Sequence, residues 1–330
     1  MRLHHPFLIV CSFALALLAT ANACAQSAAD FPNKPIRIIV PEGTGGATDI
    51  QARLFAAKMT QLLRQQFIVD NRSGAGAAAV VPFTTVANAS PDGYTLLAVT
   101  PSFTFSPVLH KNYPVDPIRD FAPVSLLTRA PYLLVVNEGV PAKSVAELIA
   151  LAQAQPGKFN FGAGNIGSGT HLVTLWFLSA ANIKAAYIPY KSTGIAMQDL
   201  VGGRLDATLA NILSSGPFVR SGRLRALGIS SDQRSAAMPE LPTLVEQGVR
   251  GYTASTFHGY IAPAKTPAAV INKLSAEFAR AANAPDLRER LAEGGGQIIG
   301  STPAQFGQFI AGEVLNWRKL VQDTGLKIEE

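Results

Sequence analysis

Cysteine is almost absent from this chain of 330 residues: the two that occur, Cys11 and Cys24, both lie within the first 25 positions. The remainder offers no disulfide framework, no cysteine zinc site and no cysteine nucleophile. Charge is also sparse, because charged residues make up 15% of the chain, and the 28 Lys and Arg are scattered without a long basic run. Although these outnumber the 22 Asp and Glu, the pattern argues against nucleic acid as a partner.

Long apolar runs are missing as well, except at the N-terminus. Phe7–Ala19 is a run of 13 almost wholly apolar residues, preceded by an arginine and followed by two A-x-A cleavage patterns in residues 21–25. This arrangement predicts a secretory signal peptide over residues 1–25, and hence export to the periplasm. An uncleaved anchor and a lipid on Cys24 are the alternatives, although the run is short for a membrane-spanning helix.

The chain does contain a regular alternation of short apolar strands with helical patterns. Ile36–Pro41 predicts a buried strand, and a glycine-rich loop then leads into a helix over Asp49–Leu63. Further strand patterns follow at Phe67–Asp70, Tyr94–Thr100, Tyr132–Asn137, Phe159–Gly162, Ala186–Pro189, Leu205–Ala210 and Leu224–Ser230. The alternation predicts an α/β fold with a parallel or mixed sheet, and the length fits two such units. Ligands of open α/β sheets bind beyond the carboxyl ends of the strands, so the loops after strands are the candidate sites.

The first candidate site is the loop PEGTGGATD at residues 41–49, between a predicted strand and a predicted helix. Its glycines allow a tight turn and a close approach of the backbone to a ligand. The helix start adds unpaired N–H groups and the positive end of a dipole, which suit a carboxylate or a phosphate. Thr48 and Asp49 would serve equally well as helix caps. The ligand-binding residues predicted here are Glu42, Gly43, Thr44, Gly45, Gly46, Ala47, Thr48 and Asp49.

A second junction of strand, glycine loop and helix has the sequence AGNIGSGTH, at residues 163–171. Its backbone N–H groups and hydroxyls again meet at a helix start, while a lone histidine in a first turn is more often structural. Ser102 follows another strand and could donate to a ligand, with Phe103 either a wall of the site or a buried core residue. The ligand-binding residues predicted beyond the first loop are Ser102, Phe103, Asn165, Ser168, Gly169, Thr170, His171, Tyr190 and Asn211.

Signals for catalysis are weak by comparison. The first loop lacks the third glycine of the dinucleotide fingerprint, although Asp70 ends the next strand near where a ribose-binding acid would stand. Ser168 lacks the first glycine of the nucleophile pattern G-x-S-x-G, and the spacing of His110, His171 and His258 matches no metal motif. We therefore predict a binding protein with no catalytic residue, cofactor or metal, and keep an exported α/β hydrolase or NAD-dependent enzyme as the alternative.

Stretches spread over the whole chain after the predicted signal peptide resemble the Bug (TctC-like) solute receptors, the periplasmic binding components of tripartite tricarboxylate transporters. They include FPNKPIRIIVP, VDNRSGAGA, SPDGYTLL, IPYKSTG, LVGGRLDATLAN and LPTLVEQG. The resemblance implies a Venus-flytrap fold, in which two α/β domains are joined by two strands that cross near Ala122–Asn137 and Tyr252–Ile261. Domain 1 would comprise residues 26–128 and 255–330, and domain 2 residues 129–254.

The same resemblance implies a monomeric receptor that captures a small carboxylate, such as an organic, amino or aromatic acid, in the cleft between domains. Hinge closure would trap the ligand, which a membrane permease would then receive. In the family the first loop, here Glu42–Asp49, holds a ligand carboxylate partly through ordered waters. The family's second loop corresponds to Gly164–His171, and its strand-end pattern to Asp206 and Asn211. A ligand-receiving sensor for a signalling partner is a further alternative.

Glu42 departs from the family pattern, which has an apolar residue at this position. A carboxylate in a loop that should meet an anion opposes a second carboxylate by Coulomb repulsion. Glu42 would point to solvent, pair with a Lys or Arg, or accept a hydrogen bond from the ligand. We expect the third arrangement, which predicts a ligand with one carboxylate and also a donor group.

Overall fold

The computed structural model describes residues 30–72, 80–110 and 112–324. The predicted signal peptide, with Cys11 and Cys24, lies outside the described residues. The strands are β1 (Ile36–Val40), β2 (Phe67–Asn71), β3 (Thr95–Val99), β4 (Phe121–Asn137), β5 (Asn160–Ala163), β6 (Ala186–Pro189), β7 (Ala207–Asn211), β8 (Leu224–Ile229), β9 (Ser255–Pro263) and β10 (Gln297–Ile298). The helices are α2 (Ala47–Leu63), α3 (Val80–Ala87), α4 (Pro101–Leu109), α5 (Val145–Ala154), α6 (Gly169–Ala180), α7 (Thr193–Val201), α8 (Ile212–Arg220), α9 (Ala268–Ala282), α10 (Pro285–Glu293) and α11 (Pro303–Thr324).

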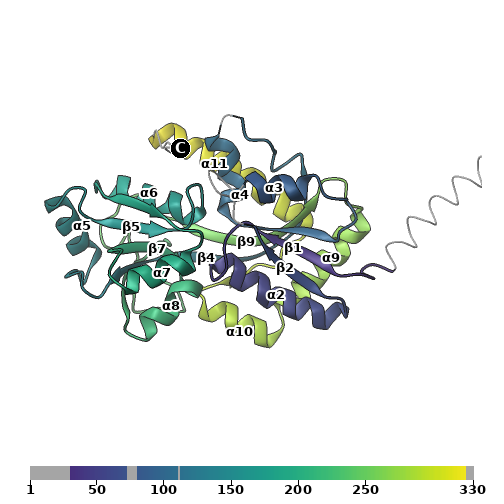
Figure 1. Cartoon of the computed structure of the whole chain (residues 1–330), viewed down its shortest axis with the longest axis horizontal. Helices are drawn as coiled ribbons and strands as arrows, with labels where there is room; N and C mark the ends of the chain where they lie inside the picture. Colours follow the sequence, from purple (N-terminus) through teal and green to yellow (C-terminus); the bar gives the residue numbers. More distant parts are fainter. Residues whose placement is uncertain (1–29, 73–79, 111, 325–330) are drawn as a thin grey trace, which may run out of the picture.

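These strands form a sheet with the order β2-β1-β3-β9-β4-β7-β5-β6, in which β8 and β10 also pair with β4. We call lobe 1 the part around β1, β2, β3, β9 and the first part of β4, and lobe 2 the part around β5, β6, β7, β8 and the end of β4. The lobes lie side by side, with β4 and β9 between them (Figure 1). Parallel pairs within each lobe are joined to antiparallel pairs along β4, which confirms the predicted α/β class with a mixed sheet.

One strand, β4, belongs to both lobes. From Phe121 to Pro131 it pairs antiparallel with β9, and from Tyr132 to Asn137 it pairs with β7 and β8. The ladder with β9 shifts register just after Pro123, where the ring nitrogen has no hydrogen to donate. The sheet of lobe 2 is therefore a direct continuation of the sheet of lobe 1 along a single strand.

The predicted crossing near residues 122–137 corresponds to β4, and the one near residues 252–261 overlaps β9, which begins later, at Ser255. Just before β9 begins, the backbone N–H of Ala254 donates to the carbonyl of Ser230 at 2.9 Å. The exact domain limits at residues 128/129 and 254/255 stay a prediction.

Both faces of the sheet are covered by helices, so the central strands are apolar on both sides. In β1, Ile38 belongs to a buried cluster with Phe55 of α2 and Phe278 of α9. Ile39, the next residue, belongs to the cluster on the other face, with Phe83 of α3. The end of β4 repeats this alternation in lobe 2, toward α5 and α6 on one face and toward α7 and α8 on the other. The period of two in side-chain direction explains why these strands read as continuous apolar runs.

Helix starts largely follow the capping patterns in the sequence. Ser144 caps α5, because its hydroxyl accepts from the N–H of Glu147, and Pro303 is the first residue of α11. Pro267 lies one position before α9 rather than at its first position. The first helix begins at Ala47, earlier than the predicted start.

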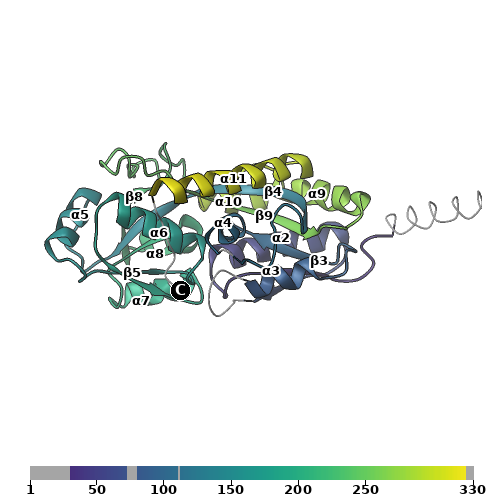
Figure 2. The same ribbon diagram turned by 90° about the horizontal axis from the view of Figure 1, so that it is seen from above.

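The long C-terminal helix α11 lies along β4 and β9 (Figure 2). Its stripe of Phe306, Ile310 and Val314 is buried in the core, and Trp317 packs edge-on against Phe105 of α4. None of the helices in the described ranges is long and apolar enough to cross a membrane.

We expect Ser230→Ala to destabilise the junction of the lobes. The Ser230 hydroxyl accepts from Tyr132 N at 2.7 Å and donates to the carbonyl of Ala254 at 2.6 Å, all within the buried interior. Removing it leaves two buried groups unpaired, which should lower the free energy of unfolding by about 2 kcal/mol. Urea denaturation measures this change. Ser231→Ala, which removes only an exposed bond to Gln233, should change it by less than about 0.5 kcal/mol, and equal losses in both variants would contradict the expectation.

Candidate ligand-binding site

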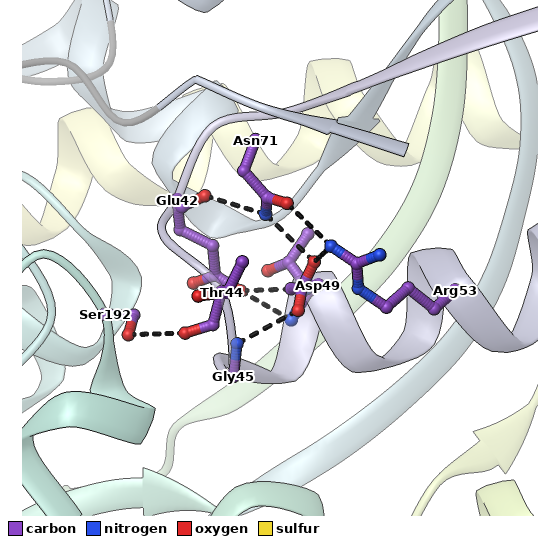
Figure 3. Close-up of polar contacts among 8 residues, drawn as sticks. Glu42, Thr44, Gly45, Asp49, Arg53, Asn71 and Ser192 are labelled. Carbon is purple, nitrogen blue, oxygen red and sulfur yellow. Dashed lines mark hydrogen bonds and ion pairs between the residues drawn. The ribbon is translucent and has the colours of Figure 1, made fainter. Parts of the chain in front are cut away.

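Glu42 lies in the loop between β1 and α2 and turns its carboxylate onto the start of that helix. Its Oε1 accepts from the backbone N–H groups of Thr48, at 2.7 Å, and Asp49, at 3.2 Å (Figure 3). The N-cap residue, Gly46, has no side chain to do this. A Cβ atom on Gly46 would lie 2.5 Å from Glu42 Oε1, so glycine leaves the space that the carboxylate fills. The chain thus supplies its own anion at the positive end of α2.

None of the three arrangements expected for Glu42 includes this cap on α2. Burial raises the pKa of the Glu42 carboxyl above its usual value, and the negative charge of Asp49 adds to the rise. Hydrogen bonds from Thr48 and Asp49 act in the opposite direction, because they favour the ionised form. Glu42 is therefore a desolvated carboxyl held by a helix start rather than by a Lys or Arg.

Asp49 holds the same loop in shape from the other side (Figure 3). Its carboxylate accepts from Gly45 N at 3.0 Å and from Asn71 Nδ2 at 2.9 Å, and it pairs with Arg53 at 2.9 Å. Burial alone would raise the pKa of Asp49, but these hydrogen bonds and the Arg53 charge together bring it below its usual value. Asp49 is ionised, and its charge is already paired within lobe 1.

The second junction, between β5 and α6, is held by its own hydroxyls. Ser168 Oγ accepts from His171 N at 3.2 Å, as an N-cap does, and Thr170 Oγ1 accepts from Gly164 N at 3.0 Å. The His171 ring accepts from Gly167 N at 3.0 Å and lies against the ring of Tyr187. Burial lowers the pKa of His171 to about 4, so its ring is neutral and serves to shape the loop.

The two lobes touch where the loop after β1 meets the loop before α7. Gly43 N donates to the Lys191 carbonyl at 3.0 Å, and the Ser192 hydroxyl donates to the Thr44 carbonyl at 2.9 Å (Figure 3). The approach is so close that a Cβ atom on Gly194 would lie 2.5 Å from the carbonyl oxygen of residue 45. These contacts close one rim of a cavity between the lobes.

This cavity has a volume of about 540 Å³, including the part that opens to solvent. It is lined by Pro41, Glu42, Thr48, Thr100, Ser102, Tyr132, Asn165, Ile166, Gly167, Ser168, Gly169, Thr170, Thr193, Asn211, Thr256 and His258. The loops after β1, β3, β5 and β7 all contribute, as expected for ligands beyond the carboxyl ends of strands.

The predicted ligand-binding residues divide into two groups in the structure. Those that line the cavity are Glu42, Thr48, Ser102, Asn165, Ser168, Gly169, Thr170 and Asn211. Those that lie outside its lining are Gly43, Thr44, Gly45, Gly46, Ala47, Asp49, Phe103, His171 and Tyr190. Phe103 packs in the core between Phe83 and Phe121, and the Tyr190 hydroxyl donates to Asp199. Contact of either group with a ligand stays a prediction.

Sequence reasoning missed the floor of the cavity, which comes from the strands that run between the lobes. Tyr132 belongs to β4, and Thr256 and His258 belong to β9. These residues are buried, so their strands read as core. The available signal was the alternation of polar side chains at positions 256 and 258 inside an otherwise apolar strand, since these two point to the same face.

The orientation of the His258 ring follows from a chain of buried hydrogen bonds. Thr128 Oγ1 donates to Gln51 Oε1 at 2.9 Å, and Gln51 Nε2 lies 2.9 Å from His258 Nδ1. With its carbonyl oxygen engaged by Thr128, Gln51 donates to Nδ1, which places the ring proton on Nε2. Burial lowers the pKa of His258 to about 3, so the ring is a neutral N–H donor at physiological pH.

Two polar atoms of the cavity lining are buried without a hydrogen-bond partner in the part of the chain that the structure describes. They are the Asn211 Oδ1 atom, an acceptor, and His258 Nε2, a donor. Buried polar atoms of folded proteins are nearly always paired, so both atoms are candidate positions for a ligand or a water molecule. Within the described ranges, no three His, Cys, Asp or Glu side chains gather as a metal site would require.

Residues 51–326 match the family described as the tripartite tricarboxylate transporter family receptor, TctC. The chain belongs to this receptor family. Among solved structures, periplasmic binding protein BugD is similar, with 29% identity and a TM-score of 0.86 over 90% of this chain and 99% of that chain. A Rhodopseudomonas palustris protein with bound malate, MatC, shares 30% identity and a TM-score of 0.84 over 88% and 100%. R. palustris Rpa4515 with adipate shares 31% identity and a TM-score of 0.85 over 90% and 99%.

These comparisons confirm the predicted Bug (TctC-like) family and the periplasmic-binding-protein fold. The family and these solved structures are solute-binding receptors rather than enzymes, which removes the hydrolase and dehydrogenase alternatives. Asp70, the candidate ribose-binding acid, is instead paired with Arg37 and Arg72.

We expect His171 to make the receptor less stable in acid. Its folded pKa of about 4 lies below the unfolded value of 6.5, so the unfolded chain binds more protons as the pH falls through this window. The resulting loss is about 2 kcal/mol between pH 7.5 and pH 5. In His171→Asn, the amide oxygen can still accept from Gly167 N, and this part of the loss should vanish. Denaturant unfolding at both pH values tests it, and an unchanged pH dependence in the variant would contradict the assignment.

Proposed function

We propose that this protein is a periplasmic receptor that binds a small carboxylate in the cavity between its lobes and delivers it to a tripartite-type membrane transporter. The observation that carries the proposal is that the start of α6, at Ser168, Gly169 and Thr170, lines a cavity that also contains the unpaired Asn211 and His258 atoms. The malate and adipate bound by similar receptors support a carboxylate as the ligand class.

The carboxylate would bind at α6 without help from a Lys or Arg. The N–H groups of Gly169 and Thr170 belong to the first helical turn, where no carbonyl of the helix can accept them. The hydroxyls of Ser168 and Thr170 are hydrogen-bonded to each other at 3.1 Å beside them, so one donates to the other and the second keeps a proton for an anion. These donors belong to lobe 2, and His258 Nε2 would donate from lobe 1.

Closure would follow from the way the lobes are connected. The contacts Gly43–Lys191 and Thr44–Ser192 are few and lie at the rim, while the continuous link between the lobes is β4. Bending where β4 passes from one lobe to the other would break the rim contacts and open the cavity. The predicted signal peptide at residues 1–25 supports periplasmic export, and the family description supports a transporter as the receiving partner.

We expect Ser168→Ala and Thr170→Ala each to weaken carboxylate binding by roughly tenfold or more, because a hydrogen bond to a charged acceptor is worth about 1.5–3 kcal/mol. Calorimetric titration with a panel that includes malate and adipate measures the effect. Ser144→Ala is the matched control, since it removes the same kind of cap from α5, away from the cavity. Wild-type affinity in both test variants would place the anion site elsewhere.

We expect a saturating ligand from that panel to reduce the radius of gyration. The closed form has its rim contacts made, and the unliganded receptor should spend part of its time with the lobes apart. Small-angle scattering with and without ligand measures the difference. Identical radii at saturation would contradict hinge closure while leaving binding itself intact.

A further inference from the structure

The charge in the cavity is unusual for a site that should attract an anion. Among the described residues that line it, Glu42 has a carboxyl group, and none is a Lys or Arg. His258 has a neutral ring, because burial lowers its pKa to about 3. A ligand with two carboxylates would therefore place its second charge in a desolvated space that already holds the Glu42 carboxyl and offers no cation.

The helix starts facing the cavity are also not equivalent. At α2, the N–H groups of Thr48 and Asp49 are taken by Glu42 Oε1. At α6, the Ser168 side chain takes only the N–H of His171, the third helical residue, which leaves the two preceding N–H groups for a ligand. Of these two helix starts, α6 thus offers an anion position, and α2 instead presents the carboxyl of Glu42 from the opposite lobe.

The unpaired atoms of the cavity indicate which other hydrogen-bonding groups a ligand needs. Asn211 Oδ1 lies in a residue with 9% exposure and finds no donor among the described residues. Asn211 Oδ1 therefore requires an N–H or O–H group from the ligand, and the Glu42 carboxyl can accept a further one beside its bonds from Thr48 N and Asp49 N. His258 Nε2, in a residue with 6% exposure, requires an acceptor.

We propose that this receptor selects amino monocarboxylates: the carboxylate binds the start of α6 and His258, and the ammonium group donates to Glu42 and Asn211. The inference rests on the proposed function and specifies the ligand class of the same cavity. Glu42 is then the residue that determines specificity, because it fills the second anion position from within the chain. A plain monocarboxylate leaves Asn211 Oδ1 unpaired and brings no donor to the Glu42 carboxyl, and a dicarboxylate adds repulsion.

Matched probes separate these classes on the full receptor after removal of bound ligand by unfolding and refolding. By calorimetric titration we would compare two ligands that carry an ammonium group, 2-aminobutyrate and 4-aminobutyrate, with two that do not. Butyrate ends in a methyl group instead, and glutarate ends in a second carboxylate. An amino monocarboxylate should bind at least about tenfold more tightly than butyrate and glutarate, since it adds charged hydrogen bonds. Glutarate or butyrate binding most tightly would overturn the proposal.

Two substitutions of Glu42 then test its role. Glu42→Gln keeps an oxygen for Thr48 N and Asp49 N but removes the charge, so the preference for the amino monocarboxylate over glutarate should fall about tenfold or more. Glu42→Ala leaves those N–H groups open, and glutarate binding should strengthen relative to wild type. Glu289→Gln, the same change on an exposed face of α10, is the control and should preserve the wild-type preference.

The outcomes distinguish the two proposals. If the receptor binds carboxylates but Glu42→Gln keeps the wild-type ratio of amino monocarboxylate to glutarate affinity, the selection by Glu42 is wrong and the receptor function stands. If no carboxylate, with or without an amine, binds the refolded wild-type protein, the proposed function fails and this inference fails with it.

Discussion

A single strand, β4, carries the hydrogen-bond ladders of both lobes, and the position of the cavity follows from it. β9 pairs with its first part, and β7 and β8 pair with its end. Where the ladder passes from one lobe to the other, Tyr132 faces the cavity together with Thr256 and His258 of β9. The floor of the site therefore lies at the place where the proposed bending would occur, and ligand contact and lobe movement would then be mechanically connected.

The walls of the cavity follow from the same sheet. β1 and β5 each end in a glycine-containing loop that leads to a helix start, and these loops line the cavity from opposite lobes. A helix start attracts negative charge, and the starts of α2 and α6 are capped in two different ways. At α2 the Glu42 carboxyl accepts from the first turn, whereas at α6 the Ser168 hydroxyl accepts only from His171 N. The two loops resemble each other in sequence. The N–H groups of Thr48 and Asp49 at the start of α2 are nevertheless bound by Glu42, whereas the first two N–H groups of α6 are left for a ligand.

Buried neutral donors and acceptors, rather than pairs of opposite charges, give this cavity its polarity. His258 is held as a neutral donor through Gln51 and Thr128, and the Asn211 amide adds an acceptor. Neutral groups of this kind cost less to desolvate than charges, and each still penalises a ligand that leaves it unpaired. Under our proposal, selectivity depends on matching donor to acceptor, and the Glu42 carboxyl adds a bias against a second negative group.

The sequence by itself determined the α/β class and the strand–loop–helix junctions, because these depend on local periodicity, glycines and caps. Its resemblance to the Bug (TctC-like) receptors indicated the family. Ser168, Thr170 and Asn211 could be named in advance, since each follows a recognisable strand. The tertiary structure alone decided which polar atoms meet. The Glu42 carboxyl on the start of α2, the ring proton of His258 and the position of Tyr132 depend on distances of about 3 Å between groups. Such distances are set by the packing of whole elements, and β4 and β9 look like ordinary core strands until both lobes are assembled around them.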